Sequence, residues 1–434
     1  MKSLPRRALN AAKFRGRKVA LRSRTTALAL ADRATSAARR NVPEPIRLRL
    51  SRTFLRPAQP ARVSIDKLLL GAQGGLSATD FARVTGNPLW PSTRVADGPH
   101  VALLQAGAVT DDDILASRYG QLGLACLRAT GGFFWADSPA GVVEVARDFL
   151  ARRRSTGGYE PRANQSGTDD PILVEKIRDS DCYSVLDGHH RIALAYAAGE
   201  TAVSVVVKRT STSTPLQELL RRMSWLEGST ELYQPVDFPE LKSWTLVRQC
   251  TDRLDKMQKF LDTRRIFGSY LDVASCYGWF VERMSAVGFV AEGIEKDPLA
   301  VPLGTAIYRL QPGMVHSGQC EEFLRGGRVW DVVSCFSLLH HFVLGRGSVS
   351  AEELVKLLDA ATGSVLFLDM GQEHEDWFGT SLAGWDAERI RAFLAEHGTF
   401  DEIVDLGPDS DGVGAYAGNY GRHLFACVRQ AVSR

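Results

Sequence analysis

Two short segments in the C-terminal half place small residues and a carboxylate where a nucleoside could bind. Residues 272–278 read Asp-Val-Ala-Ser-Cys-Tyr-Gly and follow an apolar run. A turn of small residues lets the backbone pass close to a nucleoside, and the N-terminus of the following helix faces the ligand. Glu295 ends the next apolar run, 17 positions after Gly278. A carboxylate at that point can accept hydrogen bonds from both hydroxyls of a ribose.

Histidines follow two further apolar runs. Residues 329–342 end in Leu-Leu-His-His-Phe, and residues 371–377 read Gly-Gln-Glu-His-Glu-Asp-Trp. Histidine is the usual general base near neutral pH, so the sequence predicts one base from a small set, with a carboxylate as its orienting group or as an alternative base. That catalytic set is His340, His341, His374 and Glu373. The competing interpretation is that His340 or His341 packs in the core. We expect no metal within residues 371–377, because their spacing matches no standard ligand pattern.

The elements that position these residues alternate along the chain. Period-2 and continuous apolar runs predict strands, and three- and four-residue spacing predicts helices. The predicted strands are 270–274, 290–295, 314–317, 329–336, 364–370, 402–406 and 422–428. The predicted helices are 244–261, 278–287, 298–308, 351–361 and 386–397. Such alternation predicts an α/β fold with a mainly parallel, doubly wound, Rossmann-like sheet.

Taken together, residues 241–434 resemble class I methyltransferases that use S-adenosyl-L-methionine. The loop of that family is usually Asp-x-Gly-x-Gly-x-Gly. Here Ala274 and Cys276 replace the first two glycines, and only Gly278 remains. The resemblance implies S-adenosyl-L-methionine as cofactor and assigns each part of it a set of residues. The methionine part would be framed by Asp272, Ala274, Ser275 and Gly278, the ribose held by Glu295, the adenine flanked by Gln319 and Cys320, and the pocket floor lined by Phe336 and Ser337.

The methyl acceptor is suggested by two polar segments. Residues 371–377 and residues 415–422, Ala-Tyr-Ala-Gly-Asn-Tyr-Gly-Arg, resemble methyltransferases of bacterial surface-glycan or glycolipid assembly. The resemblance implies O-methylation of a sugar, a glycolipid or another small acceptor in glycan biosynthesis. Residues 415–422 would form either a wall for a sugar ring or a Gly-rich hairpin turn.

A second motif lies in the N-terminal half, where residues 187–191 read Asp-Gly-His-His-Arg at a helix start. Gly188 permits close approach, the helix N-terminus supplies N–H donors, and Arg191 can bind phosphate oxygens with two hydrogen bonds. The motif therefore predicts a nucleotide or phosphate site made of Asp187, Gly188, His189, His190 and Arg191.

Residues 61–208 resemble the ParB/sulfiredoxin superfamily, most clearly over 171–208, which implies an α+β domain. Sulfiredoxin chemistry needs a Cys beside the His-Arg pair, and this chain has none there. The domain would bind a nucleotide or serve as a docking module. In the alternative function, it is a nucleotide-dependent kinase or hydrolase beside an inactive methyltransferase-like domain.

Composition sets the remaining expectations. Residues 1–60 carry 16 Lys and Arg against two acids, so we interpret them as a basic arm that is either solvated, bound to anionic lipid, or a transit peptide. Residues 209–240 are interpreted as a linker, in which Thr214 and Pro215 suit the N-cap and first residue of a helix. In the N-terminal half, residues 63–70 predict a strand, and Ser138 before Pro139 predicts the start of a helix over 139–152. Nucleic acid is not expected, because aromatic residues do not interleave with the basic ones. Seven scattered cysteines and the lack of a membrane-length apolar run predict a cytoplasmic protein, with peripheral membrane contact through the arm.

Overall fold

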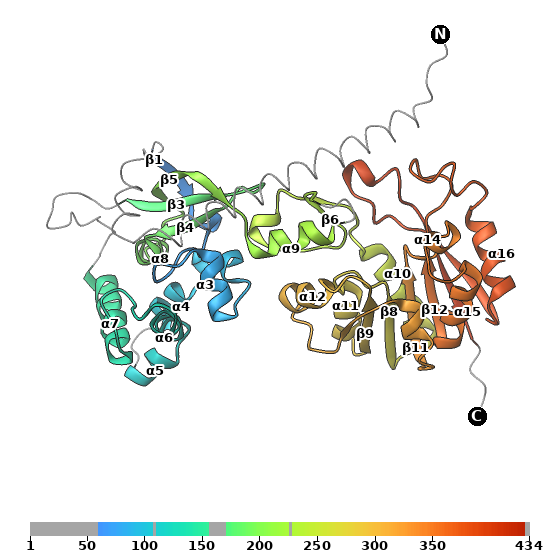
Figure 1. Ribbon diagram of the computed structural model, residues 1–434, viewed down its shortest axis with the longest axis horizontal. Coiled ribbons are helices and arrows are strands. Elements are labelled where there is room, and N and C mark those ends of the chain that lie inside the picture. The colour runs from blue at the N-terminus through green and yellow to red at the C-terminus, as the bar shows by residue number, and fades with distance from the viewer. Residues whose placement is uncertain (1–59, 107–109, 156–170, 225–227, 430–434) are drawn as a thin grey trace, which may run out of the picture. The chain divides into compact units, whose positions relative to one another are not determined.

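The structure is a computed structural model that describes residues 60–106, 110–155, 171–224 and 228–429 (Figure 1). These residues form two compact units. The N-terminal unit contains residues 60–218 and 237–244, and the C-terminal unit contains residues 219–236 and 245–429. The predicted basic arm lies outside the described residues. Among the described residues, no helix combines the length and the apolar character needed to span a bilayer.

The N-terminal unit is built on a five-stranded mixed sheet of order β1-β5-β3-β4-β2. Its strands are β1 (Pro60–Ser64), β2 (Leu68–Leu69), β3 (Ile172–Ile177), β4 (Tyr183–Asp187) and β5 (Ala202–Thr212). Its helices are α3 (Ala78–Thr85), α4 (Pro99–Ala106), α5 (Asp111–Ala116), α6 (Arg118–Thr130), α7 (Pro139–Ser155) and α8 (His189–Ala197), with α9 (Pro215–Met223) at its end. Strands and helices are interspersed in both orientations, so the unit is the α+β domain that was predicted.

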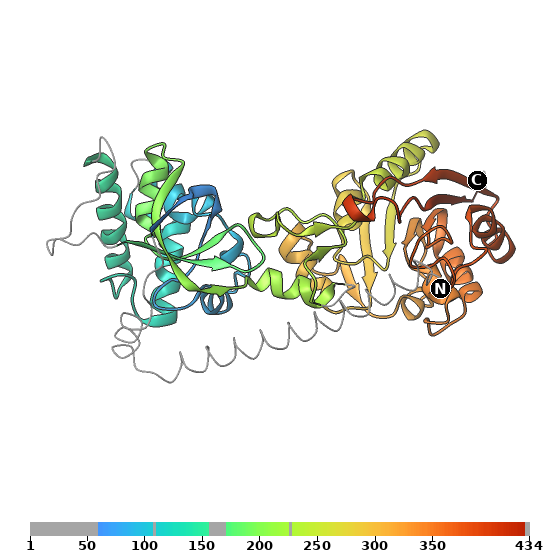
Figure 2. The same ribbon diagram turned by 90° about the horizontal axis from the view of Figure 1, so that it is seen from above.

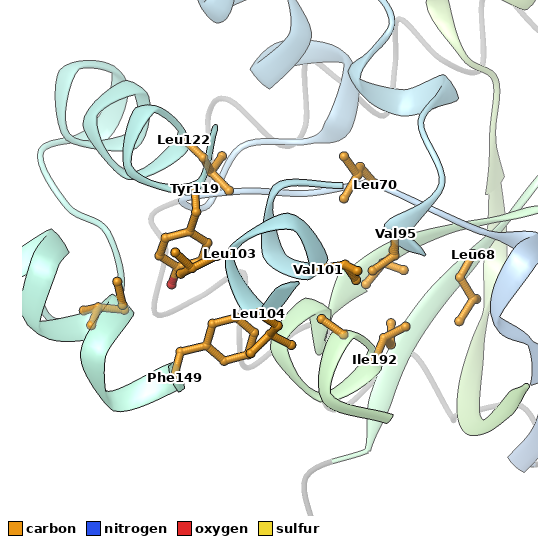
Figure 3. Packing of buried hydrophobic residues seen from close by; sticks show 14 of the residues in the cluster. Leu68, Leu70, Val95, Val101, Leu103, Leu104, Tyr119, Leu122, Phe149 and Ile192 are labelled. Carbon is orange, nitrogen blue, oxygen red and sulfur yellow. The ribbon is translucent and has the colours of Figure 1, made fainter. Parts of the chain in front are cut away.

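The core of this unit lies between the sheet and α4, α6, α7 and α8 (Figure 3). Leu104 of α4 and Ile192 of α8 are both fully buried in this core. Helix α7 begins as predicted, because the Ser138 hydroxyl accepts a hydrogen bond from the Gly141 N–H at 3.4 Å and Pro139 occupies the first helical position.

The C-terminal unit contains a seven-stranded sheet of order β10-β9-β8-β11-β12-β14-β13 (Figures 1 and 2). The strands are β8 (Ser269–Val273), β9 (Val290–Glu295), β10 (Val315–Ser317), β11 (Trp330–Phe336), β12 (Thr362–Asp369), β13 (Glu402–Pro408) and β14 (His423–Val428). The first five strands pair in parallel, whereas β14 lies antiparallel between β12 and β13. This is the sheet arrangement of the class I methyltransferase fold.

Helices cover both faces of this sheet. One face packs against α13 (Cys320–Leu324), α15 (Ala351–Ala361) and α16 (Ala387–His397), and the other against α10 (Thr251–Arg264), α11 (Trp279–Ala286) and α12 (Ala300–Tyr308). Neighbouring residues of a strand divide between the two cores: Val333 points to the first and Val332 to the second. Burial on both faces explains the continuous apolar runs. The predicted Rossmann-like, doubly wound fold is confirmed.

Three predicted elements were wrong. The predicted strand at 63–70 is broken by a 3-10 turn, Ile65–Lys67, which sends β1 and β2 to opposite edges of the sheet. The predicted helix at 244–261 begins only at Thr251, because Cys250 adopts a left-handed φ of 65° and the preceding β7 (Thr245–Leu246) pairs with β6 (Glu231–Leu232).

The start of the predicted linker, residues 209–215, is also ordered. Strand β5 continues to Thr212 and pairs with Ile177 of β3. Hydroxyl-bearing residues suggest a linker when read alone, but Thr is equally suited to a strand. The predicted helix start is confirmed, because α9 begins at Pro215 and Thr214 caps it by accepting a hydrogen bond from the Gln217 N–H at 3.2 Å.

Candidate functional site

The turn after β8 takes the left-handed conformation that glycines usually supply. Ala274, Cys276 and Gly278 have φ of 61°, 54° and 88°. That conformation costs a residue with a Cβ about 1–3 kcal/mol. Ala274 and Cys276 nevertheless adopt it, at the two positions where glycines are usual. At Gly278 a side chain has no room, because a Cβ would lie 2.7 Å from Leu310 Cδ1. Strain of this kind is characteristic of ligand sites.

The carboxylate of Glu295 holds this turn. Its Oε2 accepts a hydrogen bond from the Cys276 N–H at 3.0 Å, and its Oε1 accepts one from the Asp297 N–H at 3.2 Å. Burial raises the pKa of Glu295. The Tyr277 side chain does not block the turn, since its hydroxyl is bound to the backbone of Gln234 at 2.9 and 3.1 Å. Turn and carboxylate therefore meet at the carboxyl edge of β8 and β9, as predicted.

Asp272 is buried on β8, two residues before Ala274. Its Oδ1 accepts a hydrogen bond from the Ser334 hydroxyl at 2.7 Å, and Ser334 also bonds the Tyr270 hydroxyl at 2.6 Å. Burial raises the pKa of Asp272 to about 7, although Ser334 and Arg253 act in the opposite direction. Asp272 therefore links β8 to β11 from within the site.

The remaining predicted cofactor residues divide by exposure. Gln319 is exposed at the start of α13, and Cys320 beside it is buried, with its thiol 3.2 Å from Glu321 Oε2. Phe336 packs on Phe280 with ring centroids 4.8 Å apart. Both Gln319 and Phe336 lie at carboxyl ends of strands of the same sheet, next to the turn and Glu295.

A network of buried arginines and carboxylates lies beside Ser337, and the sequence interpretation missed most of it. Ser337 has a φ of 56°, and its Oγ accepts hydrogen bonds from Arg248 Nη1 at 2.9 Å and from Arg422 Nη1 at 2.7 Å. The Ser337 N–H donates to Asp369 Oδ1 at 2.7 Å. The whole set comprises Arg248, Arg253, Arg422, Asp369, Asp409, Asp411, Glu375 and Ser337.

Each arginine of this network meets carboxylates at short range. Arg253 bonds Asp369 at 3.0 Å and Asp411 at 2.8 Å, and Arg248 bonds Asp409 at 2.6 Å. Burial opposes ionisation of Asp369, but the neighbouring guanidinium groups hold its pKa well below its usual range. Spacing in the sequence does not reveal these pairs, because partners lie up to 161 positions apart. The network ties three loops to the carboxyl edge of β12.

The two adjacent histidines have different environments. His340 is buried, and its Nδ1 accepts a hydrogen bond from the Gly371 N–H at 3.2 Å. A neutral His340 therefore carries its proton on Nε2. His341 is half-buried, and burial together with Arg346 and Lys296 lowers its pKa to about 4. The centroid of its ring lies 4.2 Å from that of His340.

The other two predicted catalytic residues are exposed. His374 Nε2 lies 3.3 Å from the Tyr420 carbonyl oxygen. Glu373 Oε2 accepts a hydrogen bond from the Gly384 N–H at 2.7 Å, so this carboxylate holds its own loop. The expectation that Glu373 orients a histidine therefore has no supporting contact among the described residues.

In the N-terminal unit, the predicted phosphate motif is only partly directed to solvent. Gly188 has a φ of 106° before α8, and the exposed Asp187 pairs with Arg191 at 2.8 Å. His189 Nε2 accepts a hydrogen bond from the Gly71 N–H at 3.3 Å.

The second histidine of the motif, His190, lies between two aromatic rings. Its ring stacks on Phe149 and Phe134, with centroids 4.1 and 4.7 Å away. Burial lowers the pKa of both His189 and His190 to about 3. His189 is buried and His190 is half-buried, so both rings pack within the unit, and their contact with phosphate stays a prediction.

A cavity of about 640 Å³ lies at the other end of α8. It is lined by Ile65, Leu104, Arg153, Tyr196 and Glu200 among others, and it contains none of the predicted site residues.

Comparisons with known proteins address each unit separately. Residues 162–221 match the family model described as the ParB N-terminal domain. Among solved structures, one match is WbdD with the kinase inhibitor LY294002, 18% identical over 46% of this chain and 46% of that chain, with a TM-score of 0.38. Another is the bifunctional kinase-methyltransferase WbdD, 20% identical over 47% and 45%, with a TM-score of 0.37.

A third match is the magnesium protoporphyrin IX methyltransferase of Synechocystis PCC 6803 with bound SAM, 16% identical over 42% of this chain and 79% of that chain, with a TM-score of 0.31. The chain spans less than half the length of the WbdD chains that it matches. A comparison with curated proteins found no match. The chain thus combines a segment similar to the ParB N-terminal domain with a C-terminal unit of Rossmann-like, doubly wound fold.

Proposed function

We propose that the C-terminal unit is a methyltransferase that uses S-adenosyl-L-methionine. The observation that carries this proposal is the hydrogen bond from the Cys276 N–H to Glu295 Oε2 across a turn of three left-handed residues. This geometry closes a backbone cradle at the carboxyl edge of the sheet, where ligands of doubly wound folds bind.

The residues present fit the cofactor. The buried Ser275 Oγ has no hydrogen-bond partner among the described residues, and the lack of a side chain at Gly278 keeps the turn narrow. Glu295 would hold the ribose and Gln319 the adenine, while the turn backbone would hold the methionine part. When bound, the cofactor supplies a methyl group on a positively charged sulfur.

We infer that His341 is the general base toward a hydroxyl acceptor. The His341 ring is half-buried, and burial lowers its pKa to about 4, so the ring is neutral near pH 7 and has a nitrogen lone pair for a proton. His341 would take the proton of the acceptor hydroxyl, and the bound cofactor would supply the methyl group. His340, with Nδ1 engaged by the Gly371 N–H, fits a packing and positioning role. This assignment supports O-methylation of a sugar, a glycolipid or a related small acceptor.

For the N-terminal unit we propose a docking site for a phosphorylated group, such as a nucleotide. The support is the left-handed Gly188 at the start of α8 and the solvent-facing pair of Asp187 and Arg191. Titration of ATP and CTP against the full chain and against Arg191→Ala tests it, with phosphate release followed in parallel. Nucleotide turnover lost in the variant would favour the alternative function, a nucleotide-dependent kinase or hydrolase.

The methyltransferase proposal is tested by calorimetric titration of the full chain with S-adenosylhomocysteine. Glu295→Ala should weaken binding about 10- to 100-fold, because it removes charge-assisted hydrogen bonds to the ligand and to the turn. Glu322→Ala, an exposed glutamate on α13, is the matched control and should bind like the unmodified chain. Equal affinity of both variants, or no binding at all, contradicts the proposal.

A further inference from the structure

Three aromatic side chains gather at one side of the candidate site in the C-terminal unit. The Trp377 ring lies 6.2 Å from Tyr416 and 5.6 Å from Tyr420, measured between ring centroids. Trp377 belongs to the loop after β12, and both tyrosines belong to the loop between β13 and β14. We call these residues the aromatic platform. Its two loops are joined by the Asp376 N–H, which donates to Asn419 Oδ1 at 3.3 Å.

The platform is rigid before any ligand arrives. The Trp377 Nε1–H donates to Glu375 Oε2 at 2.5 Å, and the fully buried Glu375 is bound by Arg422 through two nitrogens at 2.8 and 2.7 Å. Tyr420 is fixed from one side by the Arg248 guanidinium, 4.5 Å from its ring centroid. Trp377 nevertheless keeps 38% of its surface exposed. An exposed ring with a fixed orientation binds a flat partner at low entropic cost.

The platform lies in the same site as the proposed base. A chain of ring contacts leads from His341 to His340 at 4.2 Å, then to Phe378 at 4.8 Å and to Trp377 at 6.4 Å. The same loop contacts His340 directly, because the Gly371 N–H donates to its Nδ1. Trp377 and His341 thus lie on segments that follow neighbouring strands, so an acceptor that reaches both must extend past His340 and Phe378.

The polar groups around the platform select the kind of ligand. Glu373, His374 and Asp376 are exposed, and Asn419 is half-buried. Carboxylates and amides bind hydroxyl groups, whereas exposed carboxylates repel phosphates and resist the desolvation that a lipid tail would impose. A neutral ring that carries hydroxyl groups and has one apolar face can bind both to these polar groups and to the aromatic platform.

We propose that the aromatic platform is a carbohydrate-binding subsite that holds a sugar ring of the methyl acceptor against Trp377. The inference rests on the proposed methyl transfer for its purpose, but the subsite can be tested by itself. Trp377→Ala removes the stacking surface, and Trp377→Phe keeps an aromatic ring while losing the bond to Glu375. The matched control is Trp135→Ala, since Trp135 is 60% exposed in the N-terminal unit.

The experiment measures retention of the full chain, with S-adenosylhomocysteine present, on an array of neutral bacterial oligosaccharides and on an oligolysine peptide. We expect oligosaccharide retention that falls at least about tenfold in Trp377→Ala, falls less in Trp377→Phe and is unchanged in Trp135→Ala. Binding of S-adenosylhomocysteine, measured by calorimetry, should be the same in all variants.

Three results would overturn the subsite: no oligosaccharide retained while S-adenosylhomocysteine binds, equal retention by Trp377→Ala, or preference for oligolysine. Retention that depends on Trp377 without any binding of S-adenosylhomocysteine would leave the subsite standing and remove the proposed methyl transfer. The two proposals therefore fail in different ways.

Discussion

The buried ion pair of Arg422 and Glu375 offers the sharpest test of how the site is held. Arg422 Nε and Nη2 donate to the two oxygens of Glu375 at 2.8 and 2.7 Å, and Arg422 Nη1 donates to Ser337 Oγ at 2.7 Å. Arg422→Met keeps an unbranched apolar stem, shorter than that of arginine, and removes all three bonds. The Glu375 carboxylate would remain buried with the Gln372 N–H and the Trp377 Nε1–H as donors.

Removing one member of a buried pair leaves an uncompensated charge and costs about 3–5 kcal/mol. We therefore expect Arg422→Met to lower the free energy of unfolding of the C-terminal unit by that amount. The double variant Arg422→Met/Glu375→Gln should recover about 2–3 kcal/mol, because the second substitution removes the stranded charge.

Because the chain has two units, its unfolding need not be two-state, so the assay must report on the C-terminal unit alone. Amide hydrogen exchange of β12 and β14, read by mass spectrometry, meets this need. Arg264→Met is the matched control: Arg264 pairs with Glu402 at 2.8 Å, but the two side chains are 41% and 46% exposed, so its loss should cost less than about 1 kcal/mol. Equal effects of the two variants would refute the argument from burial.

Four further predictions concern the turn and the proposed base. Cys276→Gly should raise stability by about 1 kcal/mol in urea denaturation and preserve binding of S-adenosylhomocysteine, because it relieves a left-handed φ; a loss of stability contradicts this. Gly278→Ala should weaken that binding, since the new Cβ would force Leu310 Cδ1, 2.7 Å away, to shift and would strain a φ of 88°, and unchanged affinity would show that the turn can move. Burial raises the pKa of Asp272 from its ordinary value of 3.8 to about 7, so the folded state holds the proton more tightly and stability should fall as pH rises from about 4 to about 7. Asp272→Asn should reduce this fall in urea denaturation at pH 5 and pH 8. His341→Asn should lower kcat about 10²- to 10⁴-fold in a methyl-transfer assay with unchanged affinity for S-adenosylhomocysteine, and an unaltered kcat rules His341 out.

Local pattern was enough to predict much of the C-terminal unit. Continuous apolar runs identify strands buried on both faces, and the small residues of 272–278 identify the turn, because both signals come from residues adjacent in the chain. Even the replacement of two glycines by Ala274 and Cys276 did not obscure the turn. Both residues keep the left-handed backbone conformation that glycines would supply. The strain that this conformation imposes on a residue with a Cβ became visible only in the structure.

The role of a residue could not be predicted from the sequence where it depends on partners far away in the chain. His340 and His341 are adjacent in the sequence, and what distinguishes them is burial and the Gly371 N–H on another loop. His189 and His190 suit a phosphate site by type, but aromatic rings from α7 and from the loop before it enclose His190. The strand predicted at 63–70 is divided because its two halves find partners on opposite edges of the sheet.

The sequence by itself determined the fold of the C-terminal half and the place of the turn at residues 272–278, because hydrophobic periodicity and backbone conformation are local properties. Only the tertiary structure decided which polar groups share the site. The buried arginine network and the aromatic platform assemble from loops that meet when the strands align, and burial then sets the charge of each group. A partner such as Asp409, 161 positions from Arg248, is specified by packing and leaves no mark in local sequence.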